Sequence, residues 1–185
     1  MSTSDILPFA SAPPPASPPY AFFRLPIVFG PLRGYGWLPA SGGKLLRILL
    51  GTYEREQTNL FQELVGPGSY VLDVGAAHGY YTLLAGHLAG PTGQVISFEP
   101  DRENAAFLRE HVTVNSLDHV SIHEWAIGDC EGRMRFGAGT GTGTGRLCES
   151  GDKEVRVRRL DDIFADDSFL PNHIKIDVEG AEVAV

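Results

Sequence analysis

A carboxylate followed closely by two glycines is the feature of this sequence best suited to chemistry. Asp73 ends a short apolar run that begins at Tyr70, and Gly75 and Gly79 follow it with three residues between them. An apolar run of this length is typical of a buried strand, and a helical pattern begins at Tyr80. Strand, glycine turn and helix form the arrangement by which an α/β sheet brings its backbone close to a nucleotide-like ligand.

The spacing of these glycines argues against a dinucleotide. A dinucleotide-binding turn has the pattern G-x-G-x-x-G, whereas here Asp73 stands in place of the first glycine and the pattern is D-x-G-x-x-x-G. A carboxylate repels a pyrophosphate and attracts an ammonium or sulfonium group. This chemistry fits S-adenosylmethionine (SAM), which has a cationic sulfur, an amino-acid tail and no phosphate. The same residues also fit an ordinary turn between a strand and a helix in any parallel sheet.

A second acid, Glu99, ends the next apolar run, which extends from Gln94 to Phe98 and predicts the second strand. An acid at this point, twenty residues after the glycine turn, is placed to accept hydrogen bonds from both hydroxyls of a ribose. Pro100 then begins a helical pattern that continues to Asn115. The alternative is that Glu99 is only a charge favoured near the start of a helix.

A third strand is expected from Val120 to Trp125, followed by a loop from Ala126 to Asp129. Such a loop, at the carboxyl end of its strand, would lie against an adenine ring, or it would be a plain turn. The glycine- and threonine-rich stretch at 137–145 resembles a phosphate loop but lacks the G-K-[ST] ending, which favours a flexible surface loop. We expect an exposed strand at 154–158 and a short helix at 160–164.

Two further acids, Asp177 and Glu179, lie at the end of a fourth predicted buried strand, Ile174 to Val178. Because the carboxyl ends of parallel strands face the crevice where ligands bind, both are candidates for a general base or for positioning an acceptor. His173 is a weaker candidate. The acids could instead hold a divalent cation, and Glu179 could merely begin the next helix.

The chain before the first strand divides at about residue 42. Residues 1–20 are rich in proline and are expected to be disordered or to adopt a polyproline II conformation. Residues 21–42 are expected to form an irregular cover or to line a substrate entrance. A short helix is expected at 44–50. A second is expected from Tyr53 to Val65, with Thr52 as its cap and Leu60, Phe61 and Leu64 as its buried stripe. We therefore predict an N-terminal segment, 1–42, and one ligand-binding domain, 43–185.

Composition narrows the classes of function. A chain of 185 residues suits one domain, and a net charge of -8 with a pI of about 5.2 argues against bulk binding of nucleic acid. Two separated cysteines predict neither a disulfide framework nor a zinc site, and they fit a reducing compartment. Neither a secretory signal nor a membrane-spanning stretch is apparent. We therefore expect a cytoplasmic protein.

The motifs together resemble the FkbM family of SAM-dependent methyltransferases over residues 51–185. The matching stretches are 51–54, 73–82, 98–100, 160–162 and, most specifically, the K-I-D-V-E-G-A-E of 175–182. The resemblance implies a Rossmann-like, doubly wound, mostly parallel α/β sheet and SAM as methyl donor. It also implies an acceptor oxygen on a sugar or other small molecule. The implied cofactor-binding residues are Asp73, Gly75, Ala76 and Gly79 for the methionine part, Glu99 and Pro100 for the ribose, and Ala126 and Ile127 for the adenine.

The chain departs from the family at its C-terminus. The family's fold continues past the fourth strand with further helices and strands, whereas this sequence stops at Val185. We therefore expect a partial domain with an open sheet edge at its fourth strand and an incomplete acceptor pocket. The alternatives are a SAM-binding remnant without turnover, a nicotinamide dehydrogenase and an interaction module acting through the proline-rich tail.

Overall fold

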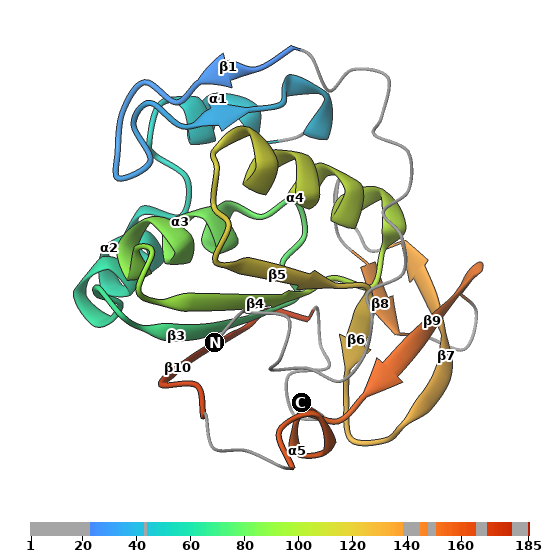
Figure 1. Ribbon diagram of the computed structural model, residues 1–185. Coiled ribbons are helices and arrows are strands. Elements are labelled where there is room, and N and C mark those ends of the chain that lie inside the picture. The colour runs from blue at the N-terminus through green and yellow to red at the C-terminus, as the bar shows by residue number, and fades with distance from the viewer. Residues whose placement is uncertain (1–22, 43, 139–144, 148–150, 166–169, 179–184) are drawn as a thin grey trace.

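Four parallel strands form the central sheet of the computed structural model, which describes residues 23–42, 44–138, 145–147, 151–165, 170–178 and 185 (Figure 1). Their order across the sheet is β10 (His173–Ile176), β3 (Tyr70–Val74), β4 (Gln94–Phe98) and β5 (Val120–His123). The chain runs outward from β3 to β5 and then returns to the other side of β3. The strand order therefore reverses beside β3, which is where doubly wound sheets bind ligands. The predicted Rossmann-like α/β class is confirmed.

Helices α3 (Tyr80–Ala89) and α4 (Arg102–Val114) make the crossovers between these strands and cover the same face of the sheet (Figure 1). Val71 and Val95 pack against Ala85 on this helical face. Leu72 and Ile96 point to the opposite face. Because both faces of the sheet are covered, β3 is buried along its whole length. This burial explains why four of its five residues are apolar, with Asp73 as the exception.

A second, mixed sheet begins after β5, so the expected third strand at 120–125 is too long at its end. The chain leaves the first sheet after His123 and enters β6 (Trp125–Ile127), which pairs in parallel with β9 (Lys153–Arg158). β7 (Gly132–Ala138) pairs antiparallel with β9 and with β8 (Gly145–Leu147). The expectation of an exposed strand at 154–158 is wrong for three of its five side chains. β9 lies between two neighbours, and Val155, Val157 and Arg158 are buried.

The described part of the N-terminal segment packs onto the outer side of the helical layer. It contains β1 (Leu25–Pro26), β2 (Gly36–Trp37) and a short 3-10 helix (Pro39–Ser41), and it is followed by α1 (Leu45–Leu49), the short helix expected at 44–50 (Figure 1). Ile27, Leu32 and Trp37 are buried in one cluster with Leu83 and Leu84 of α3. This packing places residues 44–54 beside the beginning of α3.

The second expected helix differs from the prediction. α2 spans Arg55–Leu64, and the Thr52 hydroxyl donates to the Arg47 carbonyl oxygen at 3.4 Å instead of capping α2. Leu60 and Leu64 are more than half exposed, so the predicted apolar stripe is wrong apart from the half-buried Phe61. Thr58 is the buried residue of α2, and its hydroxyl donates to the carbonyl oxygen of Tyr53 at 3.1 Å.

The fourth strand, β10, lies at the edge of the sheet and in the described residues pairs only with β3. Ile174 and Ile176 are 49% and 39% exposed, so the expectation of a buried strand is wrong. The short helix predicted before it is confirmed as α5 (Leu160–Ile163). Most of the glycine-rich stretch and all of residues 1–20 lie outside the described residues.

Candidate functional site

The turn between β3 and α3 contains three residues with left-handed backbone angles. Gly75, Ala77 and Gly79 have φ angles of 76°, 48° and 94°. The N–H groups of Gly75 and Ala76 donate to the carbonyl oxygen of Phe98 at 3.0 and 3.1 Å, which ties the turn to the end of β4. The left-handed conformation of Ala77 costs about 1–2 kcal/mol, which glycine at this position would avoid. Strain of this kind gathers at ligand-binding turns.

The two glycines are required by close packing as well as by φ. A Cβ on Gly75 would lie 1.9 Å from the carbonyl oxygen of Asp177, and a Cβ on Gly79 would lie 2.2 Å from Cδ1 of Leu108. The turn is therefore clamped between the end of β10 and α4. The two glycines allow the Asp177 carbonyl oxygen and the Leu108 side chain to lie close to the backbone of the turn.

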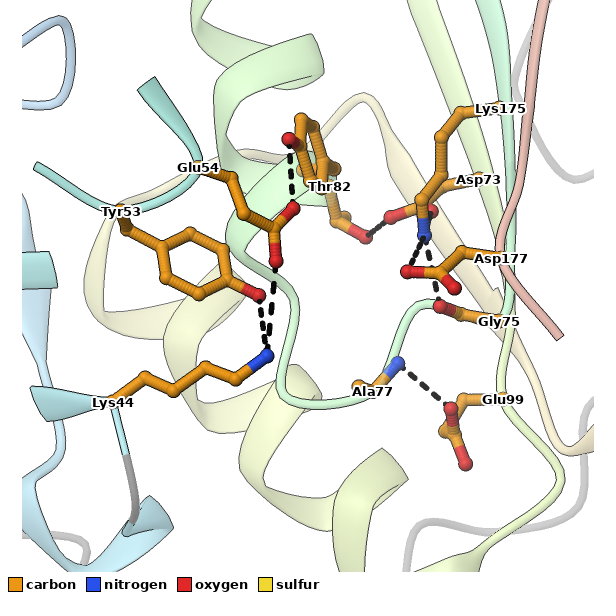
Figure 2. Close-up of polar contacts among 11 residues, drawn as sticks. Lys44, Tyr53, Glu54, Asp73, Gly75, Ala77, Thr82, Glu99, Lys175 and Asp177 are labelled. Atoms are coloured by element: carbon orange, nitrogen blue, oxygen red, sulfur yellow. Dashed lines mark hydrogen bonds and ion pairs between the residues drawn. The ribbon is translucent and has the colours of Figure 1, made fainter. Parts of the chain in front are cut away.

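Asp73 lies directly beneath the turn and is 1% exposed. Its Oδ2 accepts a hydrogen bond from the Thr82 hydroxyl at 2.6 Å, and its Oδ1 pairs with Nζ of Lys175 at 3.1 Å (Figure 2). The same ammonium group donates to the carbonyl oxygen of Gly75 at 3.0 Å. The negative charge that the sequence offers to a cationic ligand is thus already neutralised by a lysine of β10.

Glu99 lies at the carboxyl end of β4 and is 4% exposed. Its Oε2 accepts from the Ala77 N–H at 2.7 Å, and its Oε1 accepts from the Asp101 N–H at 2.9 Å and from Nδ2 of Asn104 at 3.3 Å (Figure 2). Burial raises the pKa of Glu99 to about 7, against the opposing effect of these hydrogen bonds. One carboxylate therefore joins the glycine turn to the start of α4, where Asp101 is the N-cap.

The residues proposed for ribose and adenine lie beyond this carboxylate. Pro100 is half-buried. Ala126 and Ile127 are 6% and 2% exposed, and their side chains belong to two hydrophobic clusters, with Val157 and Phe98 respectively. An adenine ring beside β6 would therefore meet backbone from these two residues.

The proposed catalytic acids follow β10. Asp177 has a side chain that is 60% exposed, with its Oδ2 3.9 Å from Nζ of Lys175. Glu179 lies outside the described residues. His173 pairs in register with Val71 at the start of the strand, so it lies at the opposite end of β10 from the turn and is not placed to act there.

Five side chains near the turn were not predicted as site residues: Lys175, Tyr81, Lys44, Tyr53 and Glu54. The Glu54 carboxylate accepts from the Tyr81 hydroxyl at 3.0 Å and lies 3.7 Å from Nζ of Lys44. That ammonium group also donates to the Tyr53 hydroxyl at 3.1 Å (Figure 2). The resemblance at 51–54 and 175–182 was the signal that could have drawn attention to Glu54 and Lys175.

The comparisons with known proteins identify the class. The family model described as the methyltransferase FkbM domain matches residues 73–185, well over half of the chain. The chain therefore belongs to the FkbM family of methyltransferases, and its cofactor is S-adenosyl-L-methionine. A search of the curated proteins finds no match.

Several solved structures are similar over part of the chain. One is an O-methyltransferase from Bacillus cereus in complex with SAH, 25% identical over 37% of this chain and 32% of its own, with a TM-score of 0.34. Another is a SAM-dependent methyltransferase from Aquifex aeolicus, 22% identical over 46% and 43%, with a TM-score of 0.36. A third is a SAM-dependent O-methyltransferase from Thermotoga maritima, 21% identical over 50% and 36%, with a TM-score of 0.38. The chain spans less than half of the length of each.

The residues at the turn fit SAM. Glu99 keeps acceptor capacity for ribose hydroxyls because a carboxylate has about four lone-pair positions and three donors occupy its oxygens here. In the part of the chain that the structure describes, no group of three or more metal-ligating side chains occurs. Over the same residues, no helix has the length and apolar character to cross a membrane.

Proposed function

We propose that this chain binds SAM across the carboxyl ends of β3 and β4 and transfers its methyl group to a hydroxyl of a sugar or other small molecule. The observation that carries the proposal is the buried Glu99 carboxylate, which accepts the Ala77 N–H of the glycine turn. It brings together a strained backbone turn and an acid, the two features needed to hold a ribose next to an adenosyl sulfur. Membership of the FkbM methyltransferase family supports methyl transfer as the reaction at this site.

The chain's own groups have distinct tasks in this proposal. Bound SAM supplies a methyl group already activated by its sulfonium, so alignment of the acceptor provides much of the acceleration. Glu99 accepts the ribose hydroxyls, and the backbone between Gly75 and Gly79 lies along the donor. Asp177, beyond the end of β10, receives the proton of the acceptor hydroxyl or orients that hydroxyl. Glu179 is the second candidate for this role.

The acceptor is a small molecule in this proposal because the chain is acidic, with a net charge of -8, and nucleic acid is disfavoured. Two cysteines without a paired spacing fit a reducing compartment, and we place the reaction in the cytoplasm.

The decisive experiment measures SAM binding by calorimetry in the wild-type chain and in Glu99→Ala. Loss of the ribose acceptor is expected to weaken binding tenfold or more, which is about 1.4 kcal/mol or above. Glu103→Ala is the matched control, because Glu103 is an exposed glutamate in the first turn of the adjacent helix and should leave the affinity within twofold. Unchanged affinity in Glu99→Ala would count against the ribose assignment.

A second candidate is binding of SAM without turnover. It is favoured by the 60% exposure of the Asp177 side chain, whose Oδ2 lies 3.9 Å from Nζ of Lys175. Incubation with methyl-labelled SAM and a panel of sugar and phenolic hydroxyls separates the two. Label in an acceptor supports the enzyme, and tight binding with no label in any acceptor supports the second candidate.

A further inference from the structure

A pair of opposite charges lies beside the glycine turn and comes from the chain before the sheet begins. Lys44 is the N-cap residue of α1, and Glu54 immediately precedes α2. Nζ of Lys44 lies 3.7 Å from Oε1 of Glu54, and the two side chains are 52% and 30% exposed. At this distance the two groups attract without forming a short hydrogen bond, so both can take up a further partner.

Glu54 has a strained backbone conformation, and its side chain is fixed by a hydrogen bond. Its φ and ψ angles are 40° and 52°, a left-handed conformation that disfavours a non-glycine residue by about 1–2 kcal/mol. The Tyr81 hydroxyl donates to its Oε2 at 3.0 Å. Burial, and then the charge of Glu54 itself, raise the pKa of Tyr81, so the phenol stays protonated and remains a donor. A strained acid fixed by a neighbouring donor is the kind of residue found at ligand sites.

Tyr81 connects this pair to the turn. Nζ of Lys175, which donates to the Gly75 carbonyl oxygen, lies 5.4 Å from the centre of the Tyr81 ring. In Figure 2 the side chains of Lys44, Tyr53 and Glu54 lie to one side of the turn, and those of Lys175 and Asp177 lie to the other. Tyr81 therefore contacts both the Lys44–Glu54 pair, through its hydroxyl, and the lysine of β10, through its ring.

The acid expected to attract the donor's cationic end is not open to it. Oδ2 of Asp73 accepts from Thr82 at 2.6 Å, Oδ1 lies in an ion pair with Lys175 at 3.1 Å, and the residue is 1% exposed. An incoming ammonium group would have to displace a lysine from a buried carboxylate, which leaves that lysine without its partner. Glu54, partly exposed and only loosely paired, presents no such obstacle.

We propose that Glu54 and Lys44 form the subsite for the amino-acid end of SAM: Glu54 accepts hydrogen bonds from the α-ammonium group, and Lys44 donates to the α-carboxylate. A zwitterion matches an ion pair of this spacing because each of its charges replaces one member of the pair as partner of the other. The assignment rests on the proposed function, since it takes the adenosyl end to lie along Glu99. In this assignment the amino-acid tail is bound by Lys44 and Glu54, which precede the sheet in the chain, and not by Asp73.

The test compares two ligands that differ in this tail. S-adenosylhomocysteine carries the zwitterionic tail on a neutral sulfur, and 5′-methylthioadenosine is the same thioether without the amino acid. Calorimetry is carried out on the full chain with Glu54→Gln, with Lys44→Met and with Glu56→Gln, an exposed glutamate in the first turn of α2, as control. We expect Glu54→Gln and Lys44→Met each to weaken S-adenosylhomocysteine tenfold or more and to leave methylthioadenosine within twofold, with no effect of the control.

Each of the following outcomes overturns the tail subsite, the proposed function, or both. Equal weakening of both ligands, or unchanged binding of both, overturns the tail subsite. If the wild type binds neither ligand, the proposed function fails and this assignment fails with it. If the wild type binds and depends on Glu99 while both tail variants bind normally, only this assignment fails. Should Glu54→Gln not fold, as judged by circular dichroism, Lys44→Met alone decides, because its half-exposed side chain is not needed for the core.

Discussion

Replacement of Glu99 by glutamine should change how the stability of the protein depends on pH. Burial raises the pKa of this carboxyl from its ordinary 4.5 to about 7 in the folded chain. Between these two values the folded chain keeps a proton that the unfolded chain has lost, so the free energy of unfolding falls as the pH rises through the window. A difference of about 2.5 pKa units corresponds to about 3 kcal/mol, which is present below about pH 4.5 and lost by pH 8.

The stability of the wild type alone would not reveal this effect. Burial lowers the pKa of both His111 and His123 to about 4. These histidines are neutral in the folded chain where they would be charged in the unfolded one, so they make stability rise with pH between about 4 and 6.5. The two effects oppose each other in nearly the same range. The informative quantity is therefore the difference between the wild type and the variant at each pH.

Glu99→Gln removes the titration and keeps the shape of the side chain. Its amide cannot accept from both the Ala77 and the Asp101 N–H groups as the carboxylate does, and this penalty is the same at every pH. We therefore expect the variant to gain about 2.5 kcal/mol relative to the wild type between pH 5 and pH 8, because part of the effect is already lost at pH 5. Urea unfolding followed by circular dichroism at pH 5, 6, 7 and 8 measures this, with Glu103→Gln as the exposed control. A difference that stays constant to within about 0.5 kcal/mol would refute the reasoning.

Two further predictions concern the packing beneath and around the turn. Lys175→Met leaves the buried carboxylate of Asp73 without its cation and should lower the free energy of unfolding by about 3–5 kcal/mol. Lys153→Met, at an ion pair whose lysine is half exposed, should lower it by about 1 kcal/mol or less in the same urea titration. Gly75→Ala should destabilise the chain more than Gly34→Ala, because both have positive φ but only the first would drive a Cβ to 1.9 Å from a backbone carbonyl oxygen. Equal losses in thermal unfolding would show that the turn relaxes around the added methyl group.

The local parts of the site could be predicted from the sequence. An apolar run, an acid, two glycines and a helical pattern lie within about a dozen residues, so their order along the chain already defines the βα turn. The same holds for Glu99, since its place at a strand end depends only on the run that precedes it. The left-handed angles of Gly75 and Gly79 follow from the same local pattern.

The parts that failed depend on pairing between distant segments. Asp73 looked like a free acid because its cation is Lys175, which is opposite to it only through the register of β10 on β3. Trp125 looked like the end of a third strand because apolar residues continue through the point where the chain changes sheets. The exposed face of α2 was misjudged because the N-terminal segment and α3 form the neighbouring core without Leu60 or Leu64.

The pairing of Asp73 changes how recognition of a cationic donor is understood. The sequence places several acids around the turn and suggests a negative field that attracts the sulfonium. In the structure Asp73 is neutralised by Lys175, Glu54 shares its charge with Lys44, and Glu99 has a pKa near 7 and is only partly ionised at neutral pH. Little net charge remains to act at a distance. In the proposed binding mode, selectivity for the donor depends on which hydrogen bonds and ion pairs it can replace at close range. A ligand with ribose hydroxyls and a zwitterionic tail would find a partner for each, whereas a pyrophosphate would meet the carboxylates of Glu99 and Glu54.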